Sequence, residues 1–161
     1  MTVKLAGAAL LTAAGWLLGW NHVRALKRRA RLLRAICDAL GLFRDELSVM
    51  RAPLPVIYAK LRERPFFRLL ALSNAEGMQT EALWRRAAGT LELAPEERET
   101  LSALGAYIGR YDAARQAEEI EDARRRLSRC AAALEQEIAA RAKNFPGLGA
   151  ALAAMAAAML F

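Results

Sequence analysis

Hydrophobic and polar positions follow a helical period through the middle of the chain. Between residues 26 and 50, apolar side chains recur at steps of three and four, while Arg28 and Asp45 lie on the opposite face. The stripe consists of Leu26, Ala30, Leu33, Cys37, Leu40, Phe43, Leu47 and Met50. This pattern predicts a long amphipathic helix with its stripe against a core. We find no alternation with the period of two that strands show, so the sequence predicts an all-α fold.

Proline and loop-forming residues divide the segment that follows. Pro53 and Pro55 end the first helix, because the residue before a proline is biased away from helical geometry. A short helix is expected over residues 56–62. Pro65 then suits the first position of another short helix, and residues 73–79, SNAEGMQ, are the best loop candidate.

Two further short helices are predicted before the last long one. Thr80 is a candidate N-cap for a helix that buries Leu83 and Trp84. Pro95 lies near the start of the next helix, and Gly109 is a plausible end for it.

Asp112 is a candidate N-cap for a long helix that runs to about Lys143. Its apolar stripe is close to a seven-residue repeat and consists of Ala117, Ile120, Leu127, Ala131, Leu134 and Ile138. The charged block over residues 118–129 is most simply a solvated helix face, and a contact for a protein partner is the alternative. We expect the two long helices to pack as an antiparallel pair completed by the short ones.

The N-terminal end predicts a membrane segment. Between residues 3 and 23 Lys4 is the only charged side chain, and about twenty helical residues rise roughly 30 Å, the thickness of a hydrocarbon core. Basic residues follow directly, and such residues stay on the cytosolic side. They are Arg24, Lys27, Arg28, Arg29, Arg31 and Arg34, of which the first five are expected at the membrane surface. A cleaved signal peptide and a basic arm for nucleic acid are the alternatives.

The C-terminal end repeats this pattern in reverse. Arg141 and Lys143 precede an uncharged run over residues 145–161, which is short for a membrane span and could instead lie in the interface. The predicted organisation is therefore a transmembrane helix at 3–23, a cytosolic helical bundle domain at 24–143 and a hydrophobic membrane segment at 145–161.

The composition agrees with a helical, membrane-attached protein and provides few candidate catalytic or metal-ligating residues. The 161 residues are 55% hydrophobic and 25% charged, with a net charge of +7. Cys37 and Cys130 match no metal-ligand spacing and fall in the apolar phase of helices, where they are expected to be buried; a disulfide would need an oxidising compartment. The single histidine, His22, has no nearby nucleophile. We expect no enzymatic activity, cofactor, metal or small-molecule substrate.

Several motifs together resemble the stage III sporulation protein AB family of endospore-forming bacteria. They are the first apolar segment "KLAGAALLTAAGWLLGW" with the arginine-rich "RRARLLRA", then "DELSVMRAPLP", "ALWRRA", "LSALGAYIGRYDAARQAEEI" and the closing "FPGLGAALAAMAAAML". The positions that carry the resemblance are Glu46, Leu47, Pro53, Leu54, Leu104, Gly105, Gly109, Asp112, Gln116 and Ile120. The order and spacing of these motifs cover nearly the full chain.

The resemblance implies a non-enzymatic platform or adaptor subunit of a secretion-like complex between mother cell and forespore. The domain would be similar in fold to the helical domain of type II secretion F proteins. The implied partners are the sporulation ATPase, stage III sporulation protein AA, and other membrane proteins of the same set; the implied location is the mother-cell membrane facing the forespore. Candidate partner contacts are Glu46, Pro53, Leu54, Gly109, Asp112, Gln116, Arg124, Arg125 and Arg126. The alternative is an exported helical binding module whose signal has been removed.

Overall fold

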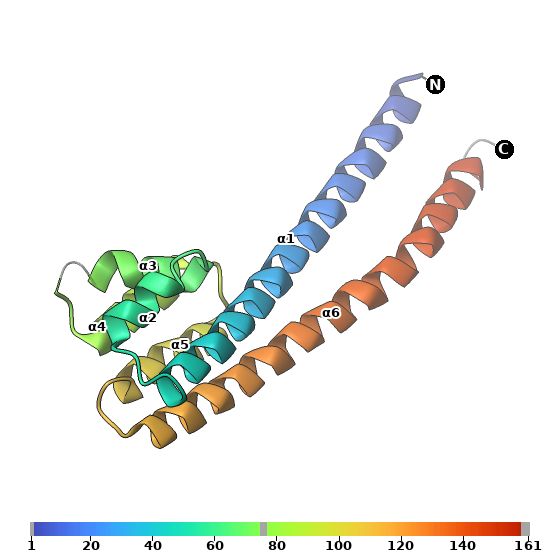
Figure 1. Ribbon diagram of the computed structural model, residues 1–161. Coiled ribbons are helices and arrows are strands. Elements are labelled where there is room, and N and C mark those ends of the chain that lie inside the picture. The colour runs from blue at the N-terminus through green and yellow to red at the C-terminus, as the bar shows by residue number, and fades with distance from the viewer. Residues whose placement is uncertain (1, 75–76, 159–161) are drawn as a thin grey trace. The chain divides into compact units, whose positions relative to one another are not determined.

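The computed structural model describes the backbone of residues 2–74 and 77–158, and the side chains of residues 20–72 and 77–141. The described residues form six helices and no strand, which confirms the all-α prediction (Figure 1). The helices are α1 (Thr2–Ser48), α2 (Leu54–Lys60), α3 (Pro65–Asn74), α4 (Thr80–Thr90), α5 (Pro95–Tyr107) and α6 (Ala113–Ala158).

The chain divides into two compact units, which we describe separately. The helical unit comprises residues 29–132, and the terminal unit comprises residues 1–28 and 133–161. In the terminal unit the guanidinium of Arg24 lies 5.3 Å from the centre of the Trp20 ring, a cation–π contact.

An aromatic cluster forms the centre of the helical unit. Phe43 of α1 lies 5.3 Å from Phe67 and 5.8 Å from Trp84, measured between ring centroids. The Trp84 indole N–H donates a hydrogen bond of 3.1 Å to the hydroxyl of Tyr58, so both polar atoms are satisfied although both residues are buried. Phe66 completes the cluster with an edge-to-face contact to Trp84 at 5.1 Å. The predicted burial of Leu83 and Trp84 is confirmed.

Helices α4 and α5 pack closely because a glycine lies between them. A Cβ atom added to Gly105 would lie 2.7 Å from the Cβ atom of Trp84 and 3.1 Å from the Cα atom of Glu81. Any side chain at this position would push the two helices apart. The Leu104-Gly105 pair in the family motif therefore has a packing role.

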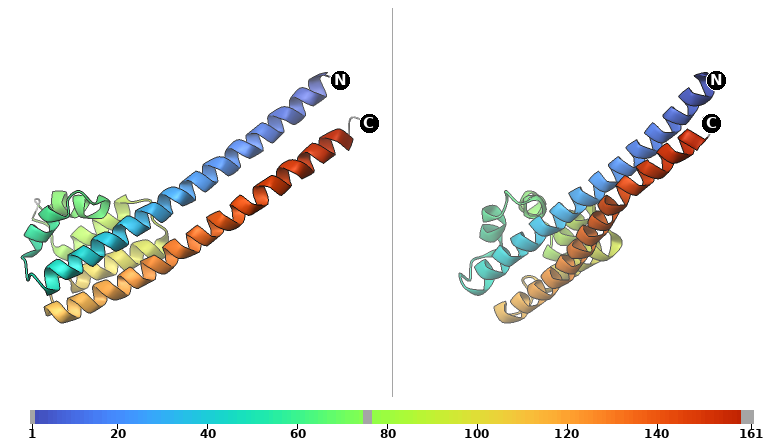
Figure 2. Two further views of the ribbon diagram at one scale, coloured as in Figure 1. Left: turned by 45° about the vertical axis from the view of Figure 1, so that its right-hand side comes forward. Right: turned by 90° about the vertical axis from the view of Figure 1, so that its right-hand side faces the viewer.

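Within the helical unit, α1 and α6 run antiparallel, as both views in Figure 2 show. Contacts pair increasing positions in α1 with decreasing positions in α6: Arg34 with Ser128, Cys37 with Arg124, and Arg44 with Glu121. The predicted antiparallel pair is confirmed for this unit.

The apolar stripes also lie where the sequence predicted them. On α1 every stripe member from Ala30 to Leu47 is buried, and on α6 Ile120, Leu127 and Ala131 are buried. Leu134 is buried as well, whereas Leu26, Ala117 and Ile138 are half-buried. Met50 is 67% exposed, because α1 ends at Ser48.

The predicted bounds of three helices need correction. Helix α2 spans Leu54–Lys60 rather than residues 56–62, and it begins earlier than predicted because Pro55 is compatible with the first turn. Thr80 is the first helical residue of α4 and not its cap; Gln79 holds the cap position without a side-chain hydrogen bond. Helix α6 continues past Lys143 to Ala158.

The predicted membrane segment 3–23 lies in α1, and residues 145–158 of the second predicted segment lie in α6; residues 159–161 lie outside the described residues. Most of their side chains lie outside those that the structure describes. Among the described residues, no helix combines the length and the apolar character needed to cross a membrane.

Candidate functional site

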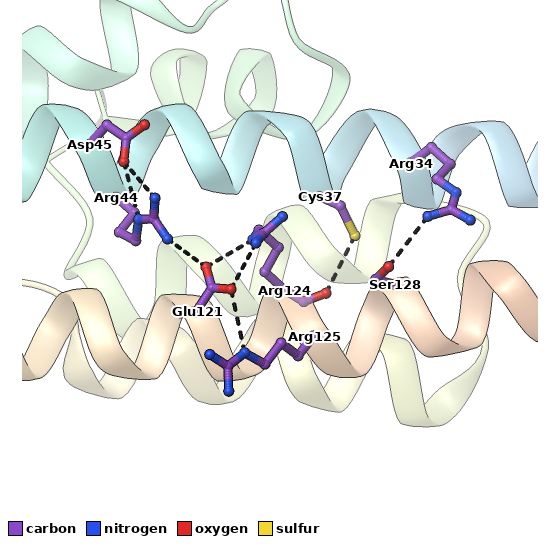
Figure 3. Close-up of polar contacts among 8 residues, drawn as sticks. All are labelled: Arg34, Cys37, Arg44, Asp45, Glu121, Arg124, Arg125 and Ser128. Carbon is purple, nitrogen blue, oxygen red and sulfur yellow. Dashed lines mark hydrogen bonds and ion pairs between the residues drawn. The ribbon is translucent and has the colours of Figure 1, made fainter.

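Helices α1 and α6 meet in a polar seam, which we define by Arg34, Cys37, Arg44, Asp45, Glu121, Arg124, Arg125 and Ser128 (Figure 3). Its centre is the carboxylate of Glu121. Arg124 binds this carboxylate with two nitrogens, at 2.9 and 2.7 Å, and Arg44 of α1 reaches it at 2.7 Å. The Arg125 guanidinium lies 3.4 Å from the same group. One carboxylate thus holds three arginines from two helices.

The arginines strongly favour the ionised form of Glu121. The hydrogen bonds from Arg124 and the positive charges of Arg124 and Arg44 lower the pKa of Glu121 from 4.5 to about 2, against the opposing effect of burial. Arg44 also donates to Asp45 at 2.8 and 3.1 Å. Glu121 therefore stays charged at any physiological pH and joins α1 to α6.

The outer face of α6 beside this seam is rich in arginine. Arg126 and Arg129 are exposed there, next to Asp122, and an open depression on this face is lined by Asp122, Arg124, Arg125, Arg126, Ser128 and Arg129. Among the described residues, Arg126 and Arg129 make no ion pair, whereas Arg124 and Arg125 are held by Glu121. The three arginines predicted as one contact therefore differ: Arg124 belongs to the seam, Arg125 lies at its edge, and Arg126 faces outward.

The connection between α5 and α6 brings together three other predicted contact residues. Gly109 has φ +81°, a conformation that favours glycine, and its N–H donates to the Gln116 side chain at 3.0 Å. Gln116 is buried and its amide also donates to the carbonyl of Tyr111. Asp112 accepts a 2.7 Å hydrogen bond from the N–H of Arg115, so its predicted N-cap role is confirmed. These side chains build the turn that starts α6.

The remaining predicted contact residues lie around the end of α1. Leu54 of α2 packs against the α5–α6 turn, since a Cβ atom on Gly109 would lie 3.3 Å from its Cδ1 atom. Pro53 is the N-cap residue of α2, and Glu46 accepts a hydrogen bond from the ammonium of Lys60. The motif residues at positions 46, 53, 54, 109, 112 and 116 therefore hold the chain connections at this end of the helical unit.

A buried ion pair was not predicted from the sequence. Glu97 of α5 is 1% exposed and accepts hydrogen bonds from the Arg29 guanidinium at 2.6, 3.0 and 3.2 Å. It also accepts the N–H of Ala94 at 2.8 Å, at the start of α5. A glutamate three residues after a cap position predicts the hydrogen bond from the Ala94 N–H, but nothing in the sequence predicts the ion pair with Arg29. Arg29, expected at the membrane surface, thus has a partner inside the helical unit.

The other basic residues expected at the membrane surface are exposed. They are Arg24, Lys27, Arg28 and Arg31. The two cysteines are free thiols: Cys37 is buried as predicted, and Cys130 is half-buried. The Cys37 thiol donates to the carbonyl of Arg124 at 3.6 Å, and burial raises its pKa to about 11. Among the described residues, no group of histidine, cysteine, aspartate or glutamate could hold a metal ion.

Fold and site define an all-α protein whose polar residues join its long helices and whose last helix presents arginines to its surroundings. The family model of stage III sporulation protein AB matches residues 4–161. The chain therefore belongs to the stage III sporulation protein AB family, which confirms the resemblance seen in the sequence motifs and gives it a role related to sporulation. No curated protein and no solved structure matches the chain.

Proposed function

We propose that the chain is a non-enzymatic platform or adaptor subunit of a secretion-like complex between mother cell and forespore. Its ends, 3–23 and 145–161, attach it to the mother-cell membrane, and its central domain lies in the cytosol. There it couples membrane subunits to a cytosolic ATPase, stage III sporulation protein AA, during endospore formation. Membership of the family and the two apolar ends of the sequence support this proposal.

The observation that carries the proposed contact is the pair of exposed arginines on α6. Arg126 and Arg129 have no ion-pair partner among the described residues, and they lie beside a seam whose own charges are tied together. Exposed charges of one sign steer a partner of the opposite sign and select it over others. An acidic surface on the ATPase is the complementary partner.

A charge-reversal experiment on the full-length chain tests this contact. Arg126→Glu combined with Arg129→Glu should weaken co-purification of the ATPase at least tenfold in detergent solution, and added salt should weaken the parent interaction. Arg124 must be left unchanged, because its substitution would break the bonds to Glu121 and disturb the fold. Arg64→Glu with Arg68→Glu is the matched control, since both residues are exposed and the change in charge is identical.

If both double variants lose ATPase co-purification equally, or if neither loses it, the result would count against the α6 face as the ATPase contact. Sequencing of the mature N-terminus separates the adaptor from the exported alternative. The adaptor retains residues 3–23, whereas a cleaved signal peptide would remove them.

A further inference from the structure

Arg124 belongs both to the polar seam and to the depression on the outer face of α6. Inside the seam its guanidinium holds the Glu121 carboxylate at 2.7 and 2.9 Å. The same side chain lines the depression together with Arg125, Arg126 and Arg129. The Arg124 side chain is 40% exposed, whereas that of Glu121 is only 18% exposed. A molecule that docks on the outer face can therefore reach Arg124 more readily than it can reach Glu121.

The contacts of Arg124 also hold α6 against α1, and Figure 3 shows its side chain between the two helices. Its backbone carbonyl accepts a hydrogen bond of 3.6 Å from the Cys37 thiol of α1. A Cβ atom added to Gly41 would lie 4.0 Å from the Cδ atom of Arg124, so the aliphatic part of this arginine packs beside the glycine. Cys37 and Gly41 lie on one face of α1, because they are four positions apart in a helix. Withdrawal of the Arg124 side chain would therefore uncover the seam next to Cys37.

The charge of the depression indicates which chemical group could withdraw this side chain. Its lining contains four arginines and one aspartate, Asp122, so the depression attracts carboxylates. Arg126 and Arg129 make no ion pair among the described residues and provide the first attraction. Arg124 already binds one carboxylate with two nitrogens, and a second carboxylate can form the same bidentate pair. Exchange of one carboxylate for another at Arg124 therefore preserves the two hydrogen bonds of its guanidinium.

We propose that docking of the ATPase loosens the α1–α6 seam, because a carboxylate of the partner replaces Glu121 as the ligand of the Arg124 guanidinium. This inference rests on the proposed ATPase contact and adds a physical connection from that contact to α1. Glu121 keeps its 2.7 Å bond to Arg44, so the two helices stay joined while Arg124 moves outward. Both helices of the seam continue into the terminal unit. By linkage, a seam that is already loosened at Arg124 must bind the ATPase more tightly.

The Cys37 thiol reports on the seam without any substitution there. The full-length chain in mild detergent is treated with iodoacetamide, with and without saturating ATPase, and mass spectrometry follows the labelling of Cys37. We expect the ATPase to raise the labelling rate of Cys37 about threefold or more, because the thiol loses the cover of Arg124. Arg126→Glu with Arg129→Glu is the control. This variant should not bind the ATPase, so adding the ATPase should leave its labelling rate unchanged.

Glu121→Gln tests the reverse direction of the same coupling. A neutral amide holds Arg124 less strongly than a carboxylate does, so the variant should bind the ATPase about twofold to fivefold more tightly. Its Cys37 should also be labelled faster in the absence of the ATPase. Glu81→Gln is the matched control, since Glu81 of α4 holds Arg85 at 2.8 Å and Arg110 at 3.1 Å. The change in charge is identical, and it should alter neither quantity.

The outcomes separate this coupling from the proposed contact. If the ATPase co-purifies with the parent chain but leaves the Cys37 labelling rate unchanged, the coupling is overturned and the α6 contact stands. Faster labelling in the Arg126→Glu, Arg129→Glu variant, or an unchanged ATPase affinity in folded Glu121→Gln, would also overturn it. If the ATPase does not co-purify with the parent chain, the contact is wrong and the coupling falls with it. The parent labelling decides the question even if Glu121→Gln is unstable.

Discussion

The ion pair between Arg29 and Glu97 provides a demanding test of how the helical unit is held together. Glu97→Ala removes a carboxylate that is 1% exposed, together with the hydrogen bonds that this group accepts from the Arg29 side chain, which is 32% exposed. Breaking a buried pair costs about 3–5 kcal/mol, and partial solvation of Arg29 reduces this to about 2–3 kcal/mol. Loss of the hydrogen bond to the Ala94 N–H adds about 0.5–1 kcal/mol. We expect the free energy of unfolding to fall by about 3 kcal/mol.

Urea unfolding of the full chain in mild detergent, followed by circular dichroism, measures this change. Glu97→Gln should cost less, about 1–2 kcal/mol, because the amide oxygen still accepts a hydrogen bond. Glu99→Ala is the control, since Glu99 is exposed on the same helix, and should change stability by less than about 0.5 kcal/mol. A double-mutant cycle with Arg29→Ala isolates the pair. A loss below about 0.5 kcal/mol in Glu97→Ala, or no coupling in the cycle, would refute this account of the unit.

Four further outcomes follow from the same contacts. Gly105→Ala should lower the free energy of unfolding by about 2 kcal/mol, because the added Cβ atom would lie 2.7 Å from the Cβ atom of Trp84. Gly89→Ala should not lower it, because the space around Gly89 is open. Urea unfolding of the two variants measures the difference. Arg51→Gly should raise stability by about 0.5–1 kcal/mol through relief of the positive φ, and an unchanged melting curve would contradict that reasoning. The pKa of Glu121 is lowered to about 2, so ionised Glu121 contributes to the free energy of unfolding, on the order of 1–2 kcal/mol after solvent screening. This contribution is present above pH 4.5 and is lost as pH falls toward 2. Glu121→Gln should therefore flatten the dependence of stability on pH between these two values. Iodoacetamide should label Cys37 more slowly than Cys130 in the folded protein, because burial raises the Cys37 pKa to about 11, and equal rates would show that the α1–α6 seam opens readily.

Local signals in the sequence determined the helices and much of the core. The apolar stripe of α1, the Asp112 cap and the stop near Gly109 follow from periodicity and from backbone preferences, which act within a few residues. The helix boundary expected near residue 143 is absent, and the backbone of α6 continues as a helix to Ala158. The alanine-rich sequence after Lys143 itself favours helix.

The order of motifs was sufficient to identify the family, but only tertiary structure decided what individual charges do. Arg29 and Glu97 are 68 positions apart, and Arg44 and Glu121 are 77 apart, so no local spacing reveals either pair. The sequence treated Arg124, Arg125 and Arg126 as one surface, whereas the packing of α1 on α6 ties Arg124 to Glu121 and leaves Arg126 outside. The local amino-acid sequence determines which helices form, because helix formation depends on neighbouring residues. Whether an arginine forms an ion pair or stays exposed on the surface depends on the side chains that distant helices bring beside it.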